Sequence, residues 1–253
     1  MKNKLESSIF YQTLLKTPGK EFLRSGFIDF LFYLAVYVGL LLWSFGLSFQ
    51  VKPLANVDLN SIAYQKASEL NSTFSTVKGF LFFLILFLVL YIVYLIVCLS
   101  FFKGKIYSRM IHKHFTKKVF FRFLKYNALW YLGMSIILIF LLLLLKNFII
   151  GVPVLVIVVF FLLYLTTIYQ VVFMHKEKKV FLNTFFVGIQ RIHKFILPII
   201  NLFIIFSIIT FVAKGIQFLP QPLPQILSGI LILAFFSFLR YYFAEVIKKE
   251  LRV

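Results

Sequence analysis

Apolar residues along the chain are gathered into six long runs that contain no Lys, Arg, Asp or Glu. The runs cover 30–51, 79–102, 126–145, 147–174, 195–213 and 215–239. Each is close to or longer than the roughly 20 apolar residues that an α-helix needs to cross a bilayer, and none carries a charge that would oppose insertion. The pattern predicts six transmembrane helices, at about 26–50, 79–102, 127–146, 151–174, 195–213 and 224–243.

Two connections between these runs keep their apolar residues at intervals of three and four. Ile106, Met110 and Phe120 belong to the first set, and Val180, Phe185 and Ile189 to the second. Basic residues occupy much of the opposite side, which is typical of a helix that lies in the membrane interface. We therefore expect interfacial helices at about 105–125 and 177–194. A solvated helix that caps the inner end of the bundle is the alternative.

The four residues KKVF occur twice, at 117–120 and again 61 residues later at 178–181. After each copy the chain reads as amphipathic segment, apolar run, short connection and second apolar run. The N-terminal third reads as a degenerate copy of the same unit. The expected fold is an all-α integral membrane protein, built as a single domain from three hairpin units with cytoplasmic amphipathic helices.

Composition supports the membrane class. Hydrophobic residues make up 62% of the chain and charged residues only 14%, whereas soluble domains are typically about 45–50% apolar and 25% charged. Too few polar side chains are present to cover a water-soluble surface. The only cysteine, Cys98, excludes a disulfide within the chain.

The net charge of +19 is unevenly distributed between the alternate connections. Of the 27 Lys and Arg residues, 22 lie in 1–25, 103–125, 175–194 and 240–253, and five lie in the other connections. Because basic loops stay in the cytoplasm, both termini are expected inside, in a plasma or inner membrane. This bias also accounts for the high pI, so no nucleic-acid partner is expected.

Motifs for catalysis or metal binding do not occur. The chain has no HExxH, GxSxG, Gly-rich phosphate loop or cysteine pair. His112 and His114 are two positions apart, so on a helix they would point about 200° from each other. We therefore expect no enzyme activity, no metal and no cofactor.

Charged residues near the apolar runs have structural interpretations. Asp29 is expected at the inner interface, paired with Arg24, and no span is expected to bury a charge. The outer connection at 51–78 carries the triplet Asn71-Ser72-Thr73, which matches the glycosylation acceptor pattern.

Two groups of candidate binding residues follow from these patterns. The basic residues of the inner connections are candidates for contact with anionic lipid headgroups: Lys113, Lys117, Lys118, Arg122, Lys125, Lys178, Lys179, Arg191 and Lys194. Three polar residues within the spans are candidates for a path through the membrane: Gln170, Asn201 and Thr210. Hydrogen bonding between helices is the alternative use of the second group.

In the segment KKVFLNTFFVGIQRIHKFILPII, residues 178–200, an aromatic residue is followed by a glycine and then by basic residues that lead into a span. Through Phe185, Gly188, Arg191 and Lys194 it resembles the six-span prokaryotic membrane-domain proteins, some of which are fused to glycerophosphodiester phosphodiesterases. The resemblance implies a membrane fold. It transfers no activity, because this chain has no appended catalytic domain.

The leading functional hypothesis is a non-enzymatic membrane module that interacts with lipids, with anionic headgroups as its partners. A permease for a neutral or amphiphilic solute is the second hypothesis. A membrane-embedded enzyme that modifies lipids is the third, and it would need an acid or histidine cluster assembled from the inner connections.

The charge bias makes a prediction about topology. An alkaline phosphatase reporter fused after residue 60 should be active, and one fused after residue 110 should be inactive, because the enzyme matures only outside the cytoplasm. Measured activity of the two fusions in intact cells tests this. Activity only at the second site would reverse the predicted orientation.

Overall fold

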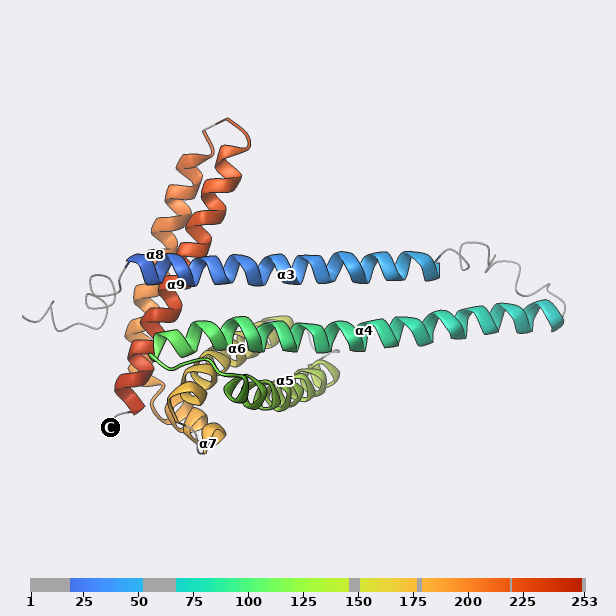
Figure 1. Ribbon diagram of the computed structural model, residues 1–253, viewed down its shortest axis with the longest axis horizontal. Helices are drawn as coiled ribbons and strands as arrows, with labels where there is room; N and C mark the ends of the chain where they lie inside the picture. Colours follow the sequence, from blue (N-terminus) through green and yellow to red (C-terminus); the bar gives the residue numbers. More distant parts are fainter. Residues whose placement is uncertain (1–18, 52–66, 146–150, 177–178, 219, 252–253) are drawn as a thin grey trace, which may run out of the picture. The chain divides into compact units, whose positions relative to one another are not determined.

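The computed structural model describes residues 19–51, 67–145, 151–176, 179–218 and 220–251 (Figure 1). The described residues form helices joined by short turns, and no strand occurs among them. Six of the helices are long and apolar enough to cross a membrane. The predicted all-α fold with six candidate spans is therefore confirmed.

Each of the six long helices extends past at least one end of the charge-free run that predicted it. They are α3 (Gly19–Val51), α4 (Ala67–Met110), α5 (Lys117–Leu145), α6 (Gly151–His175), α8 (His193–Ile216) and α9 (Leu223–Leu251). Between α6 and α8 lie a short helix, α7 (Val180–Phe185), and a π-helical turn, η3 (Phe186–Gln190). The predicted outer loop at 51–78 is partly helical, because α4 begins at Ala67. Residues 52–66 of that loop, which precede the possible acceptor Asn71, lie outside the described residues.

The chain divides into two compact units, and each is described separately. One unit is Leu31–Leu99, which contains most of α3 and α4. The other unit combines the chain up to Phe30 with Ser100–Val253.

In the Leu31–Leu99 unit, small residues of α3 let the aromatic rings of α4 approach closely. Gly39 faces the Tyr94 ring and Gly46 faces the Phe87 ring. A step of seven residues toward the C-terminus of α3 therefore matches a step of seven residues toward the N-terminus of α4. This register makes the two helices antiparallel. The Tyr94 hydroxyl donates a hydrogen bond to the Ala35 carbonyl at 2.7 Å, which fixes the ring against α3.

In the other unit, α6 supplies the centre of the core. Ile168, Tyr169, Val171 and Val172 are fully buried. Tyr169 stacks on Trp130 of α5 with 4.7 Å between ring centroids. Stretches of the helices away from this core, by contrast, expose large apolar side chains. Such broad apolar surfaces are typical of membrane or protein contact and agree with helices that face lipid.

The sequence predicted one helix over 105–125, but the structure has two helix ends and a turn there. His112 adopts a positive φ of 55°, its N–H donates to the Arg109 carbonyl at 2.9 Å, and the Lys113 N–H donates to the Ser108 carbonyl at 2.8 Å. These bonds form a Schellman motif, which ends α4. Thr116 then caps α5, since its hydroxyl accepts the Val119 N–H at 3.4 Å.

The predicted helix at 177–194 corresponds to α7 and η3, and part of its predicted apolar face is buried. Val180 of that face is buried, as are Thr184 and Val187, whereas Phe185 and Ile189 of the same face are about half exposed. The π-helical turn shifts the helical phase. Gly188 allows close packing on α6, because an added Cβ would lie 2.5 Å from Cδ2 of Leu165. A location in the membrane interface stays a prediction for this segment.

The close approach at Gly39 predicts a position-specific loss of stability. A Gly39→Val side chain would collide with the Tyr94 ring, whose hydroxyl is tied to α3, and we expect a loss of about 1–3 kcal/mol. Thermal unfolding in detergent measures the effect. Gly229→Val is the matched control, because a Cβ at Gly229 meets nothing within 4 Å. Equal melting temperatures for the two variants would contradict the packing described above.

Candidate functional site

A carboxylate from α3 is buried between two cations from α4 and α9. The Asp29 side chain is 1% exposed, the Arg240 side chain 7% and the Lys103 side chain 16%. Lys103 Nζ donates to Asp29 Oδ1 at 3.0 Å, and the Arg240 guanidinium contacts both carboxylate oxygens. Arg240 Nε also donates to the Phe236 carbonyl at 3.1 Å. We call Asp29, Lys103 and Arg240 the buried ion cluster.

The expected pairing of Asp29 with Arg24 is wrong. Arg24 instead contacts Glu21 at 3.4 Å in an exposed i,i+3 pair. The reason is helical geometry: residues three or four apart share a face of a helix, and residues five apart do not. Asp29 therefore faces the core while Arg24 faces outward.

The expectation that no span buries a charge is also wrong. Each member of the buried ion cluster lies within one of the six long apolar helices. The sequence contains a signal for this arrangement, since Asp29, Lys103 and Arg240 are the residues that directly bound three of the charge-free runs. In the predicted topology all three bound their runs at the inner end. One acid and two bases at the same predicted membrane level are able to form ion pairs, which reduce their net charge to +1 and so favour their burial.

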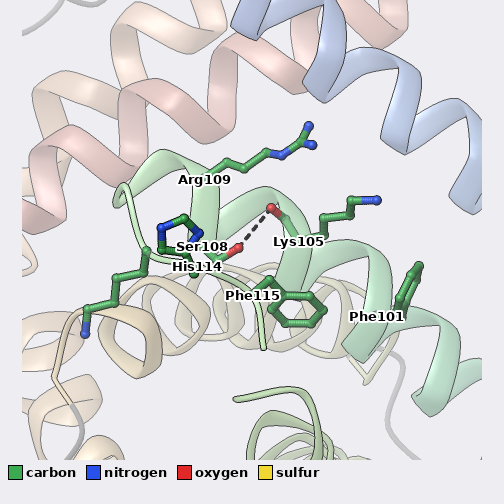
Figure 2. A pocket seen from close by; sticks show the side chains of 7 residues that line it. Phe101, Lys105, Ser108, Arg109, His114 and Phe115 are labelled. Atoms are coloured by element: carbon green, nitrogen blue, oxygen red, sulfur yellow. Dashed lines mark hydrogen bonds between the residues drawn. The ribbon is translucent and has the colours of Figure 1, made fainter. Parts of the chain in front are cut away.

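A basic pocket lies at the turn between α4 and α5. Its volume is about 350 Å³, and it is lined by Phe101, Lys105, Ser108, Arg109, Lys113, His114 and Phe115 (Figure 2). Lys105 and Arg109 are one helical turn apart, and Figure 2 shows them extending on the same side of α4. No acidic residue lines the pocket, so it concentrates positive charge.

The backbone of the turn determines the shape of this basic pocket. The Schellman bonds at the end of α4 reverse the chain and place Lys113 and His114 opposite the last helical turn. The Ser108 side chain is 1% exposed and donates to the Lys105 carbonyl at 3.1 Å. Gly104 leaves room for the Phe115 ring, since an added Cβ would lie 2.6 Å from Phe115 Cε2.

Aromatic side chains adjoin the basic pocket on one side. Phe101, Phe115 and Phe120 form a triangle of edge-to-face contacts, each with 6.2 Å between ring centroids. Phe121 extends this group from Phe120 at 5.2 Å and is 64% exposed. The basic pocket therefore adjoins an exposed aromatic surface.

Most of the predicted lipid-contacting lysines are exposed. Lys113, Lys117, Lys118, Lys125, Lys179 and Lys194 have this character, and only Lys113 of this group lines the basic pocket. Arg122 is half-buried with its guanidinium 5.8 Å from the centre of the Phe173 ring. Lys178 lies outside the described residues.

Arg191 has a structural partner rather than a free headgroup-binding guanidinium. Its Nη1 donates to the Glu250 carbonyl at 2.6 Å and to Glu250 Oε2 at 3.0 Å. The guanidinium also lies 5.0 Å from the centre of the Phe186 ring. These contacts tie the end of η3 to the end of α9.

The three polar residues proposed for a membrane path have separate hydrogen-bond partners. Gln170 Nε2 donates to the Tyr131 hydroxyl at 3.4 Å, and Asn201 Nδ2 donates to the Tyr242 hydroxyl at 3.1 Å. Thr210 is exposed and donates to the carbonyl of Phe206 in its own helix. The structure brings no two of them together, and the bonds of Gln170 and Asn201 are of the interhelical kind.

Within the described ranges, no three His, Cys, Asp or Glu side chains lie close enough together to bind a metal ion.

The buried ion cluster predicts that Asp29→Asn destabilises the protein by about 3–5 kcal/mol, because the substitution leaves two buried cations without their anion. Thermal unfolding in detergent measures this loss. Glu21→Gln is the matched control; it removes an exposed pair and should cost less than about 1 kcal/mol. The double variant Asp29→Leu with Arg240→Met should recover part of the stability. A mild effect of Asp29→Asn, similar to the control, would contradict the role of the cluster.

Comparison with known proteins adds no relative to this description. No protein-family model, no curated protein and no solved structure matches the chain. The buried ion cluster and the basic pocket are therefore the observations that bear on its function.

Proposed function

We propose that the protein is a non-enzymatic membrane module that binds anionic lipid headgroups on its inner face. It would reside in a plasma or inner membrane with both termini in the cytoplasm. The observation that carries the proposal is the charge of residues 103–125, which contain eight basic residues and no acidic residue. In the structure this segment comprises the end of α4, the turn with the basic pocket and the start of α5.

The expected strength of this interaction follows from the exposed charges. Arg109, Lys113, Lys117, Lys118 and Lys125 are exposed, and each basic residue near an anionic leaflet contributes about 1 kcal/mol. Ionic screening reduces this value at physiological salt. Even at a third of full strength, the five side chains together would raise the affinity for an anionic leaflet by about tenfold.

The resemblance of residues 178–200 to six-span membrane domains concerns the membrane fold and adds no evidence for lipid binding. Two of the four residues that carry it have structural partners in this chain, since Gly188 packs on α6 and Arg191 binds Glu250. Lys194 remains exposed. We therefore place the main headgroup contacts at the α4–α5 turn and count Lys179 and Lys194 as additional contacts.

The proposal predicts that lipid binding depends on charge at the inner face. Replacement of Lys113, Lys117, Lys118 and Lys125 by Gln should lower the apparent affinity for phosphatidylglycerol about tenfold, because four headgroup-facing charges are lost. Native mass spectrometry of the full-length protein, titrated with short-chain phosphatidylglycerol, measures the affinity.

A matched control removes the same number of charges from the opposite face. Replacement of Lys52, Lys66, Lys78 and Lys214 by Gln should leave the phosphatidylglycerol affinity unchanged, because these residues belong to the predicted outer connections. Equal affinity in both four-site variants and the wild type would overturn the proposal. An equal loss in both variants would show an effect of net charge alone and would also count against it.

A further inference from the structure

The basic residues of the pocket have no carboxylate partner in the part of the chain that the structure describes. The structure describes four acidic side chains, and each is in an ion pair elsewhere: Glu21 with Arg24, Asp29 with Lys103 and Arg240, Glu245 with Lys248, and Glu250 with Arg191. Among the described residues, Lys105, Arg109 and Lys113 are in no ion pair with a carboxylate. Three basic residues therefore line one pocket of about 350 Å³.

The basic pocket is formed by the backbone and not only by flexible side chains. The hydrogen bonds of the turn, from His112 to Arg109 and from Lys113 to Ser108, hold its two sides together. Lys103 and Lys248 anchor the helix end that carries Lys105 and Arg109, since Lys248 Nζ donates to the Met110 carbonyl at 2.8 Å. A preformed site loses less conformational entropy when it binds a ligand.

The charges indicate which anion fits best. A headgroup with one negative charge would leave two of the three cations unneutralised in a partly enclosed space. A phosphate monoester carries close to two negative charges at neutral pH and three acceptor oxygens, so it meets more of the available N–H donors. Charge-assisted hydrogen bonds to such oxygens are about twice as strong as neutral ones.

The aromatic surface beside the pocket indicates that the anion is attached to an apolar chain. Phe101 both lines the pocket and is 43% exposed, and it leads to Phe120 and the exposed Phe121. A free phosphate would make no use of this surface. A phosphate ester of a lipid would place its charged group in the pocket and its acyl chains along the rings.

We infer that the basic pocket is a specific site for a lipid phosphomonoester, such as phosphatidate, in preference to monoanionic phosphodiester lipids. This inference deepens the proposed function and rests on it. It adds a preference within the class of anionic lipids and assigns that preference to Lys105, Arg109 and Lys113, whereas Lys117 and Lys118 would contribute attraction without selectivity.

The test compares two lipids and two matched double variants of the full-length protein. Native mass spectrometry at neutral pH would give apparent affinities for short-chain phosphatidate and short-chain phosphatidylglycerol. The wild type should bind phosphatidate about tenfold more tightly. The pocket variant Arg109→Gln with Lys113→Gln should lose this ratio. The control variant Lys117→Gln with Lys118→Gln removes the same charge next to the pocket and should retain it.

The possible outcomes separate the inference from the proposed function. Similar affinities for the two lipids in the wild type would overturn the inference and leave anionic lipid binding intact. If both double variants lost the preference for phosphatidate over phosphatidylglycerol, the pocket would not be the source of that preference. No binding of either lipid would overturn both. Glycerol phosphate, added as a soluble competitor, tests whether the ligand has to be a lipid. If it displaces phosphatidate at matching concentrations, the preference for a phosphate monoester is supported and the inferred contact with acyl chains is wrong.

Discussion

The burial of one carboxylate is the constraint on which the arrangement of three helices depends. Asp29 is almost fully buried, and an unpaired charge at such a site would cost several kcal/mol. It is stable there only while Lys103 and Arg240 both remain within contact distance. The first turns of α3, the last turns of α4 and the middle of α9 therefore have to keep one arrangement.

Helix α9 extends this constraint to the ends of α4 and η3. Besides Arg240, it carries Lys248, which donates to the Met110 carbonyl at the end of α4, and Glu250, which accepts from Arg191 at the end of η3. The end of α4 is thus held at Lys103 and again at Met110. Three residues of the basic pocket, Lys105, Ser108 and Arg109, lie between these two points, so the buried ion cluster and the pocket share the same end of α4.

The sequence predicted the six long helices because membrane insertion depends mainly on length and local hydropathy. It did not predict the buried ion cluster, because a charge at the end of an apolar run has the same local pattern whether it meets water or a partner. The partners of Asp29 are 74 and 211 positions away in the chain. The turn inside 105–125 was missed because His112, not glycine, adopts the positive φ that ends α4. Thr116, as a helix cap, was the one local signal of that break.

The scarcity of acidic residues divides the basic residues into those that form ion pairs between helices and those that do not. With eight acidic residues against 27 Lys and Arg, most cations have no carboxylate available. The described acids pair with cations that hold helices together, chiefly Lys103, Arg191, Arg240 and Lys248. Among the described residues, the cations at the α4–α5 turn are in no ion pair with a carboxylate, and they lie next to an exposed aromatic surface. The described acids thus hold helices together, and the described cations of the turn remain available for other contacts.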